Sequence, residues 1–309
     1  MNKLKKVGLT ALGTALVSTA SFAGDMAVTG SAVISFAGND NNNQGNGWTM
    51  SDTMVFTGSG DLDNGWAVTY THKIDGGNND TNSIKVDTGD MGVATFHGLG
   101  GSGPVAAWDD KMPTANEESW NQGAGTKSAA ATGASGNNSF SYVLPEMVEG
   151  LAAEVYYVPS HLTTELKSSF EYGLTYTGID GLTVGYAGGD NDGAAATIES
   201  TNIYATYTID AFTIGVQDNE TDSSTANSDT DFRAYGISYA VSDELSISYG
   251  ISKVQHELAS KSDQEANNFN FSYVSGGMTI SGAMGEVDNV GGTATTDNAG
   301  YELNVTFAF

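Results

Sequence analysis

The last nine residues of the chain alternate strictly between two kinds of side chain. The odd positions of residues 301–309 are aromatic or aliphatic, and the even positions are polar or small. A period of two with one apolar side is that of a β-strand whose two faces meet different surroundings. Strands of soluble sandwiches alternate too, so the pattern predicts a strand without deciding what its apolar side meets. That side consists of Tyr301, Leu303, Val305, Phe307 and Phe309.

The N-terminus has the composition of a secretory signal peptide. Lysines precede a mostly apolar run over residues 7–19, and Ser21 and Ala23 offer small side chains around a cleavage site. We therefore expect a cleaved signal peptide over residues 1–23 and a mature chain that begins at Gly24. A membrane anchor is the alternative, but the apolar run is short for a hydrocarbon core and contains glycine and threonine. No other window suits a membrane helix, so any membrane crossing has to use strands.

The composition excludes several classes of protein. The chain has no cysteine, so disulfide frameworks and thiolate sites are impossible. Without the expected signal peptide, 8 basic residues face 37 acidic ones, a balance that disfavours nucleic acid and anionic membrane surfaces as partners. Forty glycines and only four prolines, with many Asn, Asp, Ser and Thr, favour numerous strands joined by turns.

From Gly24 onward the hydrophobic pattern predicts about sixteen strands, within the even-numbered series of bacterial outer-membrane barrels. Short turns alternate with longer loops rich in Asp, Asn and Gly, and in such barrels the short turns are periplasmic. A soluble sandwich has no reason for this alternation, and a solenoid would show a fixed repeat length. The predicted strands cover residues 26–37, 49–58, 66–74, 81–88, 93–99, 139–144, 151–158, 169–177, 182–188, 201–209, 212–218, 232–241, 245–254, 268–275, 278–285 and 301–309.

The predicted strands have one apolar and one polar face. Phe170, Tyr172 and Leu174, for example, alternate with Glu171 and Gly173. A closed sheet satisfies every ladder hydrogen bond, as a hydrocarbon solvent requires. A barrel of about sixteen strands is too wide for its side chains to fill. The fold class that we expect is therefore all-β, a transmembrane antiparallel β-barrel around an aqueous channel.

One long segment, residues 98–138, lies between the fifth and sixth predicted strands and is much longer than the other connections. It begins with several glycines and Pro104, has an apolar centre around Trp108, and ends in a tract of Gly, Ala, Ser and Thr. Irregular segments of this length are usually functional or disordered. It would be the third loop on the side of the long connections, and a mobile surface excursion is the alternative to a folded role.

The chain resembles the general trimeric porins of the Gram-negative outer membrane. The resemblance rests on the strand number, the alternating loops, the long third loop and the terminal phenylalanine, and it covers essentially residues 24–309. It implies a homotrimer whose third loop folds into each barrel and narrows it, with acidic loop residues opposite an arginine cluster on the wall. The acidic candidates for this constriction are Asp109, Asp110, Glu117 and Glu118.

The wall of this chain departs from that family pattern, because Arg233 is its single arginine and points outward by parity, near a rim. The parity of the strands places five other charged residues on the lumen wall. With more carboxylates than lysines inside, we expect the pore to prefer cations. These lumen candidates are Lys73, Lys85, Glu154, Glu171 and Glu302.

Metal and catalytic sites have little support. The histidines have no metal-ligand spacing, although His72 and His97 could be neighbours across strands. No nucleophile elbow or Ser/His/Asp set is evident, so we do not expect an enzyme. Oxygen-rich runs could take calcium, but none has the twelve-residue pattern with a final glutamate. We expect no cofactor. The calcium candidates are residues 39–43, 189–193 and 218–222, and the other two histidines are His161 and His256.

We therefore expect a passive diffusion channel for small hydrophilic solutes and ions across the outer membrane. A substrate-selective porin is one alternative, which aromatic residues along the lumen would favour. A surface adhesin or structural barrel with a filled lumen is another, which bulky apolar lumen residues would favour. The early strands differ from the later ones on their outward side, where smaller or less apolar residues suit contact with another subunit. These are Gly30, Ala32, Asp52 and Met54.

Overall fold

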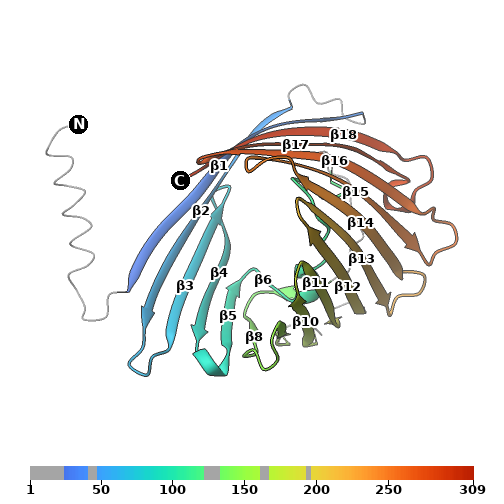
Figure 1. The fold of residues 1–309 in the computed structure, drawn as a ribbon. Coiled ribbons are helices and arrows are strands. Elements are labelled where there is room, and N and C mark those ends of the chain that lie inside the picture. Colours follow the sequence, from blue (N-terminus) through green and yellow to red (C-terminus); the bar gives the residue numbers. More distant parts are fainter. Residues whose placement is uncertain (1–23, 41–46, 122–132, 161–166, 193–195) are drawn as a thin grey trace, which may run out of the picture.

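In the computed structural model of the chain, sixteen strands close into one antiparallel barrel (Figure 1). Each of them pairs with the barrel strands before and after it in the chain, and the first pairs with the last. The barrel strands are β1 (Asp25–Asn39), β2 (Trp48–Asp61), β3 (Ala67–Asp75), β4 (Asn78–Asp87), β5 (Val93–Leu99), β8 (Ser139–Val143), β9 (Leu151–Val158), β10 (Ser169–Ile179), β11 (Leu182–Asp192), β12 (Thr197–Ile209), β13 (Phe212–Ser223), β14 (Thr230–Ala240), β15 (Leu245–His256), β16 (Gln264–Ser275), β17 (Met278–Asp288) and β18 (Asn298–Ala308).

The structure describes most of the chain beyond its N-terminal segment. The expected signal peptide, residues 1–23, and His161 lie outside the described residues. Within the described part, no helix is long and apolar enough to cross a membrane. The described ranges are 24–40, 47–121, 133–160, 167–192 and 196–309. The short elements outside the barrel are η1 (Gly89–Met91), β6 (Gly101–Ser102), α2 (Pro104–Ala107), β7 (Ser135–Gly136) and η2 (Val290–Gly292).

The last residue of the chain takes part in closing the barrel. The main-chain N–H of Gly30 on β1 donates to the carbonyl of Phe309 at 2.8 Å, and the N–H of Phe309 donates back to Gly30 at 2.9 Å. A Cβ atom on Gly30 would lie 2.8 Å from Cε2 of Phe309. The terminal ring therefore lies where any other side chain at position 30 would point. Pairing that continues to the terminus leaves fewer peptide groups unpaired in hydrocarbon, where each would be costly.

The facing that alternation predicts is confirmed along the strands. On β10, Phe170 and Tyr172 are 45% and 40% exposed, whereas Glu171 between them is 1% exposed. The same alternation follows β13, where Ile214 and Val216 are exposed and Gln217 is buried. Apolar side chains thus form the outer surface, and polar side chains point into the barrel. This is the arrangement of a barrel with lipid outside and water inside.

Two predicted loops are parts of strands instead. The pattern predicts a loop over residues 75–80, but β3 and β4 are joined by Gly76 and Gly77 alone. Both glycines have positive φ, 54° and 80°, which is the conformation of a tight two-residue hairpin. Residues 218–222, predicted as an oxygen-rich loop, lie within β13. Asp218, Glu220 and Asp222 point to one face of the strand, but neighbouring carboxylates on that face are about 7 Å apart along it, so the three cannot converge on one calcium ion.

The other calcium candidates meet the same limit or extend beyond the described residues. Residues 189–192 belong to β11, where Asp190 and Asp192 share one face about 7 Å apart along the strand. Residues 41–43 and 193 lie outside the described part of the chain. Among the residues that the structure describes, no group of three or more His, Asp or Glu side chains could hold a metal ion.

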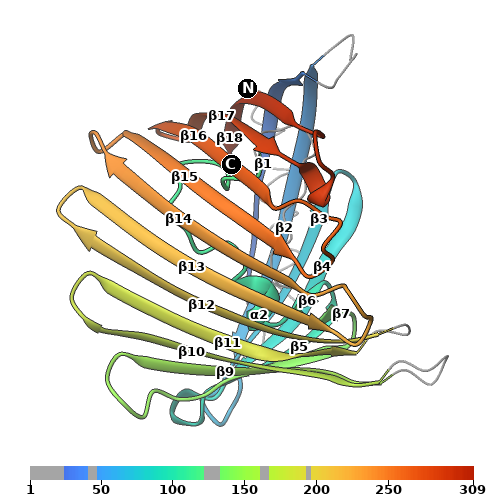
Figure 2. The same ribbon diagram turned by 90° about the vertical axis from the view of Figure 1, so that its right-hand side faces the viewer.

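The described parts of the third loop after β5, residues 100–121 and 133–138, lie inside the ring of strands (Figure 1). Its helix α2 contacts β9 to β12, and Figure 2 shows α2 beside that wall. Residues 122–132 of the loop lie outside the described residues. The buried apolar side chains gather where the loop meets the wall. One cluster contains Trp120, Phe232, Ala234, Val254, Ala266 and Val287, and the other contains Val105 and Ala187.

Candidate functional site

The third loop is fastened at its base. β6 and β7 pair as a two-residue ladder, and the N–H of Gly103 donates to the carbonyl of Ala134 at 3.0 Å. The carboxylate of Glu171 on β10 accepts hydrogen bonds from the N–H groups of Val105, at 2.8 Å, and of Ala134. The body of the loop therefore leaves and returns at one point on the wall.

Side-chain amides on the inner wall hold the loop by its main chain. Gln217 accepts a hydrogen bond from the N–H of Lys111 and donates one to the carbonyl of Trp108, both at 2.8 Å. Asn270 on β16 makes the same double contact with the peptide groups of Glu117, at 3.1 and 3.0 Å. Such contacts satisfy the peptide groups of the loop whatever side chains it carries. Asn268 donates to the carbonyls of both Glu118 and Asn121, and single contacts with the main chain of the loop come from Asn202, Asn219 and Ser248.

Two tryptophans pack the loop against the wall. The ring of Trp120 meets Phe232 on β14 edge-on, with centroids 5.0 Å apart, and Trp108 meets Tyr204 on β12 at 5.9 Å. The wall makes room with glycine, since a Cβ on Gly173 would lie 2.6 Å from the Trp108 ring. Aromatic edge-to-face pairs of this kind add to the free energy gained by burying the rings. The loop is thus bound along the wall, and the open part of the lumen lies on its other side.

All four acidic candidates of the loop belong to the part that is bound inside the barrel. Asp109, Glu117 and Glu118 are half-buried, and Asp110 is exposed. Burial, assisted by the charge of Asp110, raises the pKa of Asp109 to about 6. Burial likewise raises the pKa of Glu118, and the nearby Asp110 raises it further. Asp110 therefore lies close enough to Asp109 and Glu118 to disfavour the ionisation of both.

Glu302 on β18 joins the acidic loop residues from the wall. Its carboxylate accepts hydrogen bonds from the side-chain amides of Asn116, at the tip of the loop, and of Asn304, both at 2.8 Å. Burial, with the charge of Glu302 next in importance, raises the pKa of Glu117 to about 7. The loop and β18 thus bring two carboxyl groups close together, and their surroundings disfavour the ionised form of Glu117.

The basic candidates lie on a different part of the wall, on β3 and β4. Lys73 forms ion pairs with Asp80 at 2.7 Å and Asp75 at 3.2 Å. Lys85 points into the lumen, is exposed, and has no ion pair among the described residues. Lys111 was not a candidate, yet it lies on the loop itself, with its Nζ 3.8 Å from the carboxylate of Asp110. The described part of the loop therefore carries one lysine among its acids.

The remaining wall candidates differ in their access to solvent. Glu154 on β9 faces inward and is half-buried, whereas Glu171 faces inward but is covered by the base of the loop. His97 also faces inward and hydrogen-bonds Ser141 at 3.0 Å. His72 lies on the outward face of β3, in the row of Tyr70. The two histidines are not neighbours, because they belong to opposite faces and β4 separates their strands.

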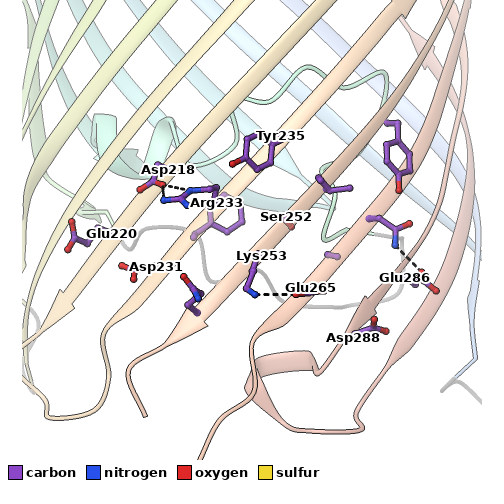
Figure 3. A pocket seen from close by; sticks show the side chains of 16 residues that line it. Asp218, Glu220, Asp231, Arg233, Tyr235, Ser252, Lys253, Glu265, Glu286 and Asp288 are labelled. Carbon is purple, nitrogen blue, oxygen red and sulfur yellow. Dashed lines mark hydrogen bonds and ion pairs between the residues drawn. The ribbon is translucent and has the colours of Figure 1, made fainter. Parts of the chain in front are cut away.

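Arg233 faces outward, as parity predicts, and its guanidinium forms an ion pair with Asp218 on β13 at 2.5 Å. Lys253 next to it pairs with Asp263 and Glu265. Figure 3 shows this charged row on the outer face of β13 to β17, where it lines a groove of about 770 Å³. The single arginine of the chain therefore does not face the third loop.

Comparison with known proteins agrees with this architecture. A family model described as Gram-negative porin matches residues 8–292. The chain belongs to the Gram-negative porin family. This membership indicates a channel for solutes in the outer membrane rather than an enzyme. No curated protein sequence matches the chain.

Several solved structures share the fold of this family member at low sequence identity. An anion-selective porin from Comamonas acidovorans aligns with a TM-score of 0.75 and 14% identity, over 92% of this chain and 99% of that one. A loop-deletion mutant of OmpT, an outer membrane protein of Vibrio cholerae, aligns with a TM-score of 0.72 and 14% identity, over 93% and 100%. A mutant of the Rh. blastica porin aligns with a TM-score of 0.65 and 12% identity, over 92% and 100%. At these identities the likeness supports the fold alone.

Sequence reasoning missed the wall residues that hold the loop. Asn202, Gln217, Asn268 and Asn270 look like ordinary polar lumen residues, because parity reports the face of a strand and not what covers it. One signal was present in the sequence. Large amides recur at inward positions of β12, β13 and β16, where serine or threonine would suffice against water. An amide can donate and accept at once, which suits it to binding a main chain.

Proposed function

We propose that this porin is a passive diffusion channel for small hydrophilic solutes that prefers cations, with the third loop as its constriction. The observation that carries the proposal is the binding of residues 103–121 to the inner wall by the amides of Gln217 and Asn270. A loop fixed in this way reduces the bore while its unpaired side stays open to water.

The charge of the narrowed region supports the preference for cations. The carboxyl groups of Asp109, Asp110, Glu117 and Glu118 lie on the bound loop, and Lys111 offsets only one of them. Carboxylates that line a narrow part of a pore concentrate cations there and repel anions. The Comamonas acidovorans porin of the same fold is described as anion-selective. At 14% identity the likeness to that porin concerns the fold alone, so the preference for cations that we propose rests on the side chains of the narrowed region of this chain.

The lumen favours a general channel over the two alternatives. Tyr156 and Tyr204 face inward, but they are only 1% and 8% exposed, so they offer solutes almost no aromatic surface. Phe232, 2% exposed, is likewise covered by the loop. A track for a particular substrate would need exposed rings, and a filled barrel would need bulky apolar residues in the open part of the lumen.

We further propose a homotrimer in the outer membrane that forms after removal of residues 1–23. The outward face of β1 and β2 carries Gly30, Ala32 and Asp52, in contrast to the aromatic outward face of β10. A carboxylate facing hydrocarbon is unfavourable, so contact with another subunit suits this face better than lipid does.

Planar-bilayer recording of the purified protein tests the channel directly. We expect stepwise conductance increases that are ohmic at low voltage and require no added substrate. A saturable block by one sugar or amino acid at low concentration would favour a substrate-selective porin. A folded barrel that produces no steps would instead support an adhesin or structural protein.

A further inference from the structure

One carboxylate inside the barrel is used entirely by the main chain of the third loop. Glu171 is 1% exposed, and no ion pair among the described residues involves it. One of its oxygens accepts from the N–H of Val105 at 2.8 Å, and the other accepts from the N–H of Ala134. These two N–H groups belong to opposite ends of the loop body, so a single side chain holds both ends.

The end of the loop body that begins with α2 needs this acceptor because of its own sequence. Helix α2 begins after Gly103, whose lack of a side chain leaves the first turn without a cap, and Pro104 has no N–H to satisfy. The first N–H of the helix that needs an acceptor is therefore that of Val105. Glu171 provides the cap from a different strand, and a charged acceptor makes a stronger hydrogen bond than a neutral one.

The surroundings leave this carboxylate little freedom to move. A Cβ atom on Gly103 would lie 2.2 Å from Oε2 of Glu171, and one on Gly189 of β11 would lie 2.7 Å from its Cγ. Glycine at both positions lets the main chain approach the carboxylate closely. Asn191 on the same strand β11 adds a hydrogen bond to the carbonyl of Gly133 at 3.1 Å, next to the incoming end.

We propose that Glu171 is a positioning residue that sets the bore and the ion preference of the channel without meeting any ion or solute. It acts by keeping both ends of the third loop on the wall, so that the acidic side chains beyond α2 stay in the narrowed region. This inference rests on the proposed function, because it concerns the loop that narrows the channel.

The decisive comparison is between Glu171→Gln and Glu154→Gln in single-channel recordings. Both variants remove one inward carboxylate from neighbouring strands, but Glu154 holds no main-chain group of the loop in any described contact. Glutamine at 171 keeps one acceptor oxygen and turns an NH₂ donor towards an N–H donor. The loss of one such hydrogen bond shifts the equilibrium between the bound and the released loop by a factor of about ten or more. We expect the time spent in a wider, noisier conductance level to rise about tenfold in Glu171→Gln.

Ion preference provides the readout that a purely structural role would not alter. In Glu171→Gln we expect the reversal potential under a salt gradient to move towards zero by more than in Glu154→Gln, although Glu154 is the more solvent-accessible carboxylate. Glu171→Asp keeps the charge but is one methylene shorter, so it can reach only one end of the loop. We expect Glu171→Asp to spend more time in the noisier conductance level than the unmodified protein and less than Glu171→Gln.

The outcomes separate this inference from the proposed function. If the unmodified protein gives no conductance steps, the proposed function fails and Glu171 is not at issue. If the unmodified protein conducts and Glu171→Gln matches Glu154→Gln in noise and in reversal potential, the positioning role is wrong. If neither Glu171 variant migrates as a folded barrel before heating, the residue is required for the barrel itself, which also overturns the proposal.

Discussion

At the scale of single residues, several carboxyl groups between the third loop and β18 are partly shielded from water. Asp109, Glu117 and Glu118 are half-buried, and Glu117 also feels the charge of Glu302. Burial in a region of low dielectric constant disfavours the charged form, and a like charge nearby adds to the effect. The number of negative charges in the narrowed region therefore depends on pH near neutrality.

The preference for cations should rise with pH between 5 and 8. The pKa of Asp109 is raised to about 6 and that of Glu117 to about 7, so both groups are mostly neutral at pH 5 and mostly ionised at pH 8. We expect the reversal potential under a fixed salt gradient to shift towards the cation value across this interval. In the variant Asp109→Asn with Glu117→Gln the shift should largely disappear. A preference that is constant from pH 5 to 8 in the unmodified protein would contradict the account.

The same residues show what a sequence can reveal about this site. Parity assigned Glu171 and Glu302 to the lumen, because water and hydrocarbon impose a period of two on every strand. It could not distinguish the roles of these two glutamates. One is hidden under the base of the loop and the other meets its tip, and both positions depend on the path of a segment more than thirty residues away in sequence.

At the scale of elements, the closing pair of β1 and β18 depends on a glycine. Gly30→Val would place a branched side chain against the carbonyl oxygen of Thr53 and the ring of Phe309, since even a Cβ would lie 2.6 Å and 2.8 Å from them. Overpacking of this kind typically costs about 1–3 kcal/mol. We expect a lower temperature for loss of the folded band in gels of samples heated stepwise. Gly58→Val on β2 is the matched control, because a Cβ there meets nothing within 4 Å, and equal losses in both variants would count against the closing contact.

Element prediction succeeded where alternation was strong and failed where polar residues were dense. The hairpin of β3 and β4 is an example, since Asn78 to Asp80 resemble a loop in composition but continue the strand. Gly76 and Gly77 were the usable signal, because two adjacent positive φ values are what a two-residue hairpin requires. For the same reason, the predicted strands ended too early where polar strand ends extend beyond the apolar band. Asp218 to Asp222 on β13 are an example.

At the scale of the whole molecule, the face of β1 and β2 should be the contact between subunits. Ala32→Trp would add a bulky ring to this face, whereas Ile214→Trp would change the outward face of β13, where a large apolar residue already meets lipid. We expect the first variant to lower the temperature at which the oligomer separates in mild-detergent gels and the second to leave it nearly unchanged. A monomer in mild detergent, or equal effects of the two substitutions, would contradict a subunit contact at this face.

The central claim is that the acids of the third loop give the channel its preference for cations. A variant with Asp109→Asn, Asp110→Asn, Glu117→Gln and Glu118→Gln removes four negative charges from the narrowed region. The matched control removes four charges from the outer face of the barrel, where they line the groove of Figure 3. It carries Glu220→Gln, Asp231→Asn, Glu286→Gln and Asp288→Asn.

The reversal potential of these three proteins under a salt gradient, recorded at pH 8 in planar bilayers, tests this claim most directly. We expect a cation-selective potential for the unmodified protein and for the outer-face control, and a potential close to zero for the loop variant. The difference should shrink as the salt approaches 1 M, where the Debye length is about 3 Å. An anion-selective potential in the unmodified protein, or equal shifts in the two variants, would contradict the account.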